Sequence, residues 1–150
     1  MTATFNLKRF LKPSVFSVAL MPFFLIGWKV ATNNLGPDPA KALALETGSW
    51  ALRFLLLTLA MTPMSQVFGR VEFVKVRRMV GLFAFFYASV HFLVWLVFLL
   101  ELRFEAFGEE LLERPFITLG FVAYLILSLL AVTSPRAMVL KLGRRWKYIH

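Results

Sequence analysis

The chain has 150 residues, of which 59% are hydrophobic, and its mean hydropathy is +0.73. A soluble domain cannot bury that much apolar surface, so the composition excludes the ordinary soluble class and indicates a multi-span membrane protein. Cysteine is absent, which excludes disulfides, thiolate-held iron–sulfur clusters and covalently attached haem, and it leaves carboxylates, His91 and His150 to hold any metal.

The first predicted membrane span covers residues 14–30. Three basic residues precede it, Pro13 is expected as its first helical residue, and Pro22 is expected to kink it. A basic start before an apolar stretch is also typical of a secretory signal, but no small-residue cleavage motif follows directly. We therefore expect a retained span.

A linker rich in glycine and proline is predicted at residues 33–48, with a short helix at 40–45, and a second span follows at 50–68. Arg53 lies one turn inside the predicted start of this span, where its side chain can reach the headgroups. Pro63 is expected to bend the second half of the span.

The third predicted span, residues 79–100, follows a short basic loop and contains His91. A histidine at membrane depth normally faces a protein interior, a cavity or a metal. Three small residues share a helical stripe beside it, and aromatic residues flank that stripe: Gly81, Ala84 and Ala88, with Tyr87, Trp95 and Phe98. The pattern fits a trough for a flat, apolar cofactor, but it is equally typical of close packing against another helix, and His91 then bonds to that helix.

Residues 101–114 are acidic and are expected to form an amphipathic helix at the membrane surface. The fourth predicted span covers residues 115–133, and the basic segment 136–150 carries interface anchors and leads toward a possible fifth span after residue 146. The predicted fold is therefore a single-domain, all-α membrane helix bundle with four spans.

The charges predict the orientation of the bundle. Twelve of the 17 Lys and Arg residues, but one of the eight acids, fall in the amino-terminal segment, the 69–78 loop and the carboxyl-terminal segment. The positive-inside rule therefore predicts that both termini lie in the cytoplasm. Because topology explains the net charge of +9, we do not expect nucleic-acid binding.

Haem ligation is the chemistry that the residues favour most. The spans lack the clustered polar groups that hydrolysis or group transfer needs, and no phosphate-binding glycine loop is present. A neutral imidazole such as that of His91 can bind iron in an apolar bundle, while arginines such as Arg77 and Arg78 can pair with propionates at the membrane edge. His91 is predicted just past mid-membrane and His150 near the cytoplasmic surface, so the two are expected to serve separate sites or to need other partners. His150 alone is equally typical of an ordinary interfacial residue.

A series of short motifs, in order and spacing, resembles the MsrQ (formerly YedZ) family of haem-binding membrane subunits within the ferric-reductase-like transmembrane group. They cover nearly the whole chain: Leu35-Gly36, Asp38-Pro39, Thr47-Gly48, Thr58-Leu59, Thr62-Pro63, Arg77-Arg78, Gly81-Leu82, His91, Arg114-Pro115, Thr118-Leu119-Gly120, Thr133-Ser134, Ala137-Met138, Lys141-Leu142-Gly143, Arg145-Trp146 and His150.

The resemblance implies a non-catalytic electron-transfer subunit in a bacterial inner membrane. Such subunits pass electrons from the quinone pool through b-type haem, with FMN as a further cofactor, to MsrP, a periplasmic molybdenum-cofactor partner that reduces methionine sulfoxide in oxidised proteins. His91 and His150 match family haem-ligand positions. Arg77 and Arg78 are expected to contact propionates or the FMN phosphate, although topology alone also explains them.

The family has about six spans and a third histidine about a dozen residues beyond His150, at the depth of His91. We therefore expect this chain to be a truncated form that binds haem weakly or not at all on its own. A different class of function also fits the sequence: a membrane scaffold or transporter in which His91 is a proton relay.

Overall fold

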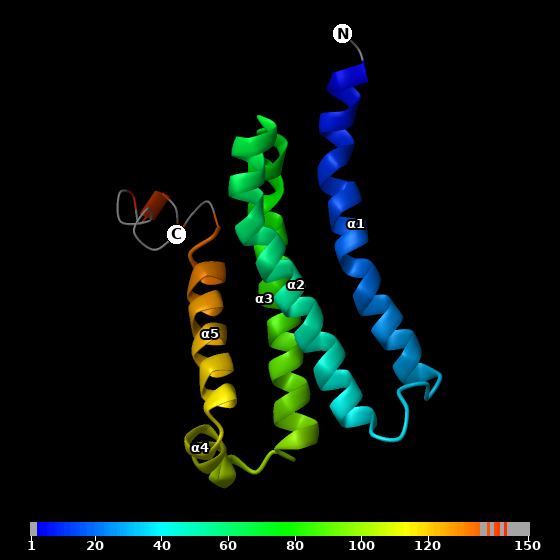
Figure 1. Cartoon of the computed structure of the whole chain (residues 1–150), viewed down its shortest axis with the longest axis vertical. Helices are drawn as coiled ribbons and strands as arrows, with labels where there is room; N and C mark the ends of the chain where they lie inside the picture. The colour runs from blue at the N-terminus through cyan, green and yellow to red at the C-terminus, as the bar shows by residue number, and fades with distance from the viewer. Residues whose placement is uncertain (1–2, 136–137, 139, 142, 144–150) are drawn as a thin grey trace.

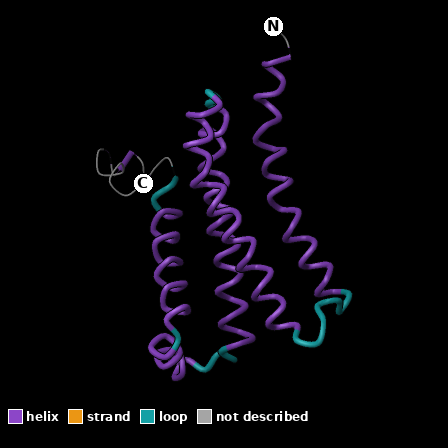
Figure 2. Tube along the Cα trace, viewed as in Figure 1, coloured by secondary structure: helices purple, strands orange, loops and turns teal. Residues whose placement is uncertain are grey.

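The computed structural model describes residues 3–135 together with 138, 140, 141 and 143. The described residues form helices and connecting turns and contain no strand (Figures 1 and 2). The elements are α1 (Ala3–Ala31), α2 (Pro39–Phe68), α3 (Glu72–Val94), a π-helical turn η1 (Trp95–Leu99), α4 (Phe104–Glu113) and α5 (Pro115–Val132).

Four of these helices are long and apolar enough to cross a membrane. The segments are Phe10–Ala31, Pro39–Phe68, Glu72–Leu99 and Pro115–Val132. An apolar helix needs about 20 residues to cross a bilayer core, because each residue adds about 1.5 Å. The predicted fold class, an all-α integral membrane helix bundle, is confirmed.

The helix boundaries differ from the predicted spans at three amino-terminal ends, and one of them is α3, which begins at Glu72 within the predicted 69–78 loop. Pro13 lies inside α1, ten residues after its first residue, and α2 begins at Pro39 instead of residue 50. The Asp38 side chain accepts a hydrogen bond from the Lys41 backbone N–H at 3.1 Å, and Pro39 occupies the first turn. This cap with a following proline starts the helix, so Thr47 and Gly48 belong to α2 and not to a linker.

The antiparallel pair α2 and α3 forms the centre of the bundle, with α1 and α5 on either side (Figure 1). The Phe54 and Tyr87 rings stack between the pair with centroids 5.1 Å apart. Tyr87 is fully buried, and its hydroxyl donates to the Ala19 carbonyl of α1 at 2.8 Å. On the other side, Tyr124 of α5 stacks on Phe92 of α3 at 4.9 Å. Aromatic contacts therefore attach both flanking helices to α3.

Two turns fix the ends of the central pair. Gly69 ends α2 in the left-handed conformation (φ 62°), which glycine adopts without a Cβ penalty. At the opposite end, α3 continues into η1, and α4 then packs against α5 near its start (Figure 1). The helix α4 thus lies within residues 101–114, the segment predicted to form an amphipathic helix.

Candidate functional site

His91 lies on α3 against the first turns of α2. Its Nδ1 is 2.9 Å from the Ala44 carbonyl oxygen and 3.4 Å from the Thr47 hydroxyl. Thr47 is 1% exposed, and its own hydroxyl donates to the Leu43 carbonyl at 2.7 Å. We call residues 44–48 the 44–48 turn, and three of them, Ala44, Thr47 and Gly48, lie beside one edge of the imidazole.

Gly48 allows the imidazole to approach the helix closely. A Cβ built on Gly48 would lie 3.0 Å from both Cε1 and Nδ1 of His91. Real Cβ atoms rarely approach other atoms so closely, so a larger residue at this position has to displace the ring. The absence of a side chain at Gly48 is therefore part of the geometry that holds His91.

The Ala44 carbonyl selects the tautomer of His91. A carbonyl oxygen can only accept, so Nδ1 must carry the proton, and Nε2 then carries the lone pair. Among the described residues, none forms a hydrogen bond with Nε2. Metal-binding histidines typically donate one ring N–H to a carbonyl or carboxylate in this way, which orients the ring and raises its basicity. The donor set at His91 therefore fits an axial haem ligand.

The small-residue stripe beside His91 packs against α2, and two of its members, Gly81 and Ala84, also line a cavity between α2, α3 and α5. Ala84 is fully buried, and a Cβ on Gly81 would lie 3.4 Å from the Thr58 methyl group of α2. The stripe therefore contacts another helix and also borders a cavity, so both interpretations of the sequence pattern have structural support. Trp95 does not line this cavity, and its ring packs on Phe107 of α4 with centroids 5.6 Å apart.

Arg77 and Arg78 line the same cavity as Gly81 and Ala84, and its volume is about 430 Å³. Its walls are mainly aliphatic and include two hydroxyl residues, Thr58 and Ser134. Along the α3 axis, Arg78 is about 20 Å from His91, since 13 residues separate them at about 1.5 Å each. The two arginines and His91 therefore belong to different levels of the bundle.

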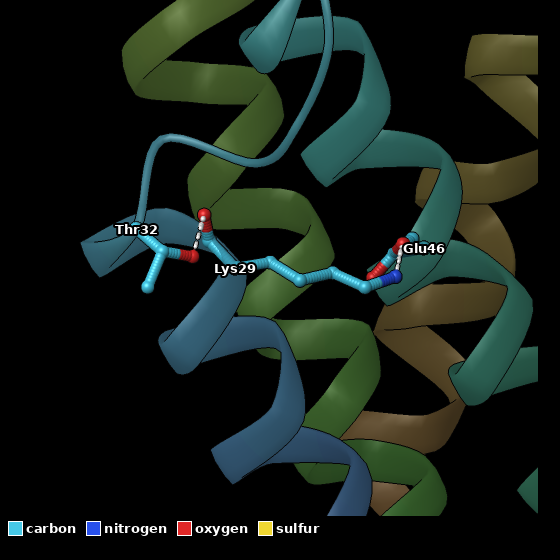
Figure 3. A network of polar contacts seen from close by, with 3 residues as sticks. All are labelled: Lys29, Thr32 and Glu46. Carbon is cyan, nitrogen blue, oxygen red and sulfur yellow. Dashed lines mark hydrogen bonds and ion pairs between the residues drawn. The ribbon is translucent and has the colours of Figure 1, made fainter.

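A second cavity of about 580 Å³ lies between α1 and α2. Lys29 of α1 forms an ion pair with Glu46 of α2 at this cavity, as Figure 3 shows. The guanidinium carbon of Arg53 lies 4.7 Å from the centroid of the Trp50 ring, and both residues also line the cavity. Arg53 is 14 residues into α2, so it lies deeper in the helix than its predicted position one turn from the start.

The remaining predicted ligand, His150, lies outside the described residues. Within the part of the chain that the structure describes, no group of three or more His, Cys, Asp or Glu could hold a metal ion. Any iron at His91 is therefore bound through a single described imidazole.

The sequence interpretation missed the contact of Thr47 and Gly48 with His91. It assigned both residues to a linker, although Asp38-Pro39 is a helix-start signal that places them in the third turn of α2. A helix that starts at Pro39 brings the 44–48 turn alongside the end of α3, where His91 lies.

Comparison with known proteins gives two findings. Residues 47–150 match the model of a family described as "Ferric reductase like transmembrane component". The chain is 43% identical over 145 residues to the "Protein-methionine-sulfoxide reductase heme-binding subunit MsrQ" of Xanthomonas euvesicatoria pv. vesicatoria, covering 93% of this chain and 66% of that protein. It is 41% identical over 140 residues to the identically named protein of Bordetella parapertussis, covering 93% of this chain and 68% of that protein. The chain thus spans about two thirds of the length of these relatives, and no solved structure matches it.

Proposed function

The chain belongs to the ferric reductase like transmembrane component family, and we propose that it is a haem-binding electron-transfer subunit of a methionine sulfoxide reductase system. Relatives 41–43% identical to it carry the name of a heme-binding subunit of protein-methionine-sulfoxide reductase. Two properties of the chain support the proposal: the membrane helix bundle and the imidazole of His91 inside it.

The observation that carries the proposal is the hydrogen bond between His91 Nδ1 and the Ala44 carbonyl. It leaves Nε2 as the electron-pair donor, and Nε2 is then the atom that binds iron in the proposed site. Bound b-type haem supplies one-electron chemistry. The chain's own contribution is to hold the imidazole in one tautomer and one orientation, through Ala44, Thr47 and the absence of a side chain at Gly48.

We assign Arg77 and Arg78 to a second binding site at the basic end of the bundle. Their cavity combines aliphatic walls with two guanidinium groups, which suits an apolar or flat body that carries phosphate or carboxylate groups. FMN phosphate or the propionates of a further haem have this chemistry. His150, near the same end of the sequence-predicted topology, is proposed as a ligand of that second haem.

The electron donor and acceptor follow from the family resemblance. We propose that electrons enter from the quinone pool and leave to a periplasmic molybdenum-cofactor partner of the MsrP type, which repairs oxidised methionine. The location is the bacterial inner membrane, with the amino terminus and the basic residues at the start of α3 on the cytoplasmic side, as the distribution of Lys and Arg favours.

A proton-relay function for His91 is less well supported. A relay histidine must gain a proton at one ring nitrogen and lose one at the other. The Nδ1 proton of His91 is held by a backbone carbonyl, which has no proton to exchange and does not pass one onward. Haem ligation uses this geometry directly, because it needs a proton fixed on Nδ1.

The test is to follow the haem in membranes that contain the full-length protein. The account expects a b-type haem spectrum that is reduced on addition of a quinol and reoxidised when the sulfoxide-reducing partner is added with its substrate. Proton-coupled solute flux through a protein that lacks haem absorbance would overturn it.

A further inference from the structure

The cavity between α1 and α2 lies on the other side of the helical segment that contacts His91. Ala44, Thr47 and Gly48 touch the imidazole, whereas Leu45, Glu46 and Ser49 line the cavity. Both sets belong to the same turns of α2, and a helix with its side chains is about 10–12 Å wide. The cavity is therefore separated from the histidine by the width of one helix.

The cavity contains polar groups of both charges within apolar walls. Glu46 is paired with Lys29 across the two helices, and Arg53 lies against the face of Trp50 (Figure 3 shows the ion pair). In the ion pairs formed by the described residues, Arg53 has no carboxylate partner. A charged side chain within a membrane helix normally pairs with something, and such residues usually mark a ligand or ion pathway.

The walls of this cavity reach the outside of the bundle. Trp28 is 70% exposed, and Leu25 and Leu45 also have exposed side chains. Because α1 and α2 are both long and apolar enough to cross a membrane, an opening between them lies within the predicted bilayer zone. A ligand can therefore enter from the bilayer, and it must itself be soluble in lipid.

We propose that this cavity is the site at which a lipid-soluble quinol is bound and oxidised. The inference rests on the proposed function, which requires a quinol donor. The Trp50 ring and the aliphatic side chains suit the quinol ring and its tail, the Arg53 guanidinium donates hydrogen bonds to a ring oxygen, and the Glu46 carboxylate accepts a ring hydroxyl proton. An anionic phospholipid suits the site less well, since Glu46 would repel its headgroup and already neutralises Lys29.

The reaction balances with the haem at His91 as oxidant. Oxidation of the quinol to the quinone breaks two O–H bonds and releases two protons and two electrons. A haem held by His91 would accept these electrons one at a time. Glu46 takes up the protons in succession and passes them to water at the end of the bundle where the α1–α2 loop lies.

Photolabelling with an azidoquinone tests the site without relying on activity. The full-length protein in phosphatidylcholine nanodiscs is labelled, and the labelled peptides are mapped. We expect labelling within residues 22–53, displaced by a short-chain quinone. In Glu46→Gln and Arg53→Gln, we expect the concentration of short-chain quinone that halves the labelling to rise about tenfold or more. Each change removes a charge-assisted hydrogen bond to the quinone.

Matched substitutions on exposed charges control for general effects. Glu105→Gln in α4 and Arg70→Gln beside α2 are expected to label like the wild type. Arg53→Lys keeps the charge but loses the planar guanidinium group, so we expect a displacement constant between those of the wild type and Arg53→Gln. Because this change is conservative, misfolding does not account for the shift. Haem absorbance is recorded for every variant, so that loss of the quinol site is distinguished from failure of the haem site.

Three results would overturn the quinol site while leaving the haem proposal intact. They are labelling mapped to other helices, unchanged displacement in both Glu46→Gln and Arg53→Gln, and loss of labelling when phosphatidylglycerol replaces phosphatidylcholine. The last result would assign the cavity to an anionic lipid.

Discussion

The Nδ1 atom of His91 lies 2.9 Å from the carbonyl oxygen of Ala44, a contact that joins α3 to α2 across 47 residues of sequence. A backbone acceptor is independent of side-chain identity at position 44, so the tautomer of the histidine is set by the path of α2. The ring position in turn depends on Gly48, where any Cβ would contact the imidazole at 3.0 Å. Substitutions in α2 can therefore change the position of the His91 ring while leaving the histidine itself in place.

The first prediction concerns Gly48→Ala. The added methyl group must displace the imidazole, which weakens the bond from Nδ1 to Ala44. Loss of such a supporting contact typically costs about 10- to 100-fold in metal affinity, and we expect haem affinity to fall by this amount in a haemin titration. Gly120→Ala is the control, because a Cβ there meets nothing within 4 Å. Equal affinity of the two variants would contradict the role of the 44–48 turn.

The second prediction concerns the hydroxyl of Thr47. Thr47→Val keeps the shape of this buried side chain and removes the oxygen 3.4 Å from Nδ1. With one acceptor fewer, the imidazole is a weaker electron donor, so we expect the haem reduction potential to rise. Thr47→Ser should restore the wild-type potential. A potentiometric titration in which the Val and Ser variants behave alike would contradict a role for the hydroxyl.

The third prediction separates the two proposed cofactor sites. Arg77→Ala and Arg78→Ala remove cations that line the cavity at the basic end of α3, about 20 Å along the axis from His91. We expect the FMN content of the purified protein to fall about tenfold while the haem signal of the His91 site is retained.

Arg70→Ala and Lys75→Ala are the matched controls, since they change charge in the same basic segment outside the cavity lining. FMN loss of the same size in the controls would mean that net charge, and not the cavity, retains the flavin.

The fourth prediction concerns the attachment of α1. Tyr87→Phe removes the hydroxyl that donates to the Ala19 carbonyl at 2.8 Å between two buried residues. A buried hydrogen bond contributes about 1 kcal/mol, so the melting temperature in detergent should fall by about 2–4 °C. Tyr124→Phe loses a longer contact, 3.4 Å to Ser89, and should lower the melting temperature less than Tyr87→Phe does. The reverse order would contradict the importance of the α1 contact.

Most of the fold was predictable because long apolar runs determine membrane helices almost by themselves. The composition and the four runs predicted the all-α membrane bundle, and the structure confirms it. The start of α2 was predicted wrongly, because the turn residues Gly36, Pro37, Asp38 and Pro39 indicated a linker, whereas Asp38 and Pro39 form the cap that starts the helix. Hydropathy marks where a helix is apolar and does not mark where it begins.

The site was predictable only in part, for a related reason. His91 was recognisable because a histidine within an apolar run is rare. Its partners come from a different helix, and one sequence does not show which turn of α2 lies opposite position 91. The small residues Gly81 and Ala84 fitted both a cofactor trough and a helix contact, and in the structure they pack against α2 and also line the cavity of Arg77 and Arg78.

The most direct measurement of the central claim is a haemin titration of the full-length protein with His91→Gly, with and without added imidazole. We predict that the variant loses the Soret band of the His91 site and that free imidazole restores it, because the ring then binds iron in place of the missing side chain. An unchanged Soret band in the variant without imidazole would contradict the claim that His91 Nε2 holds the haem iron.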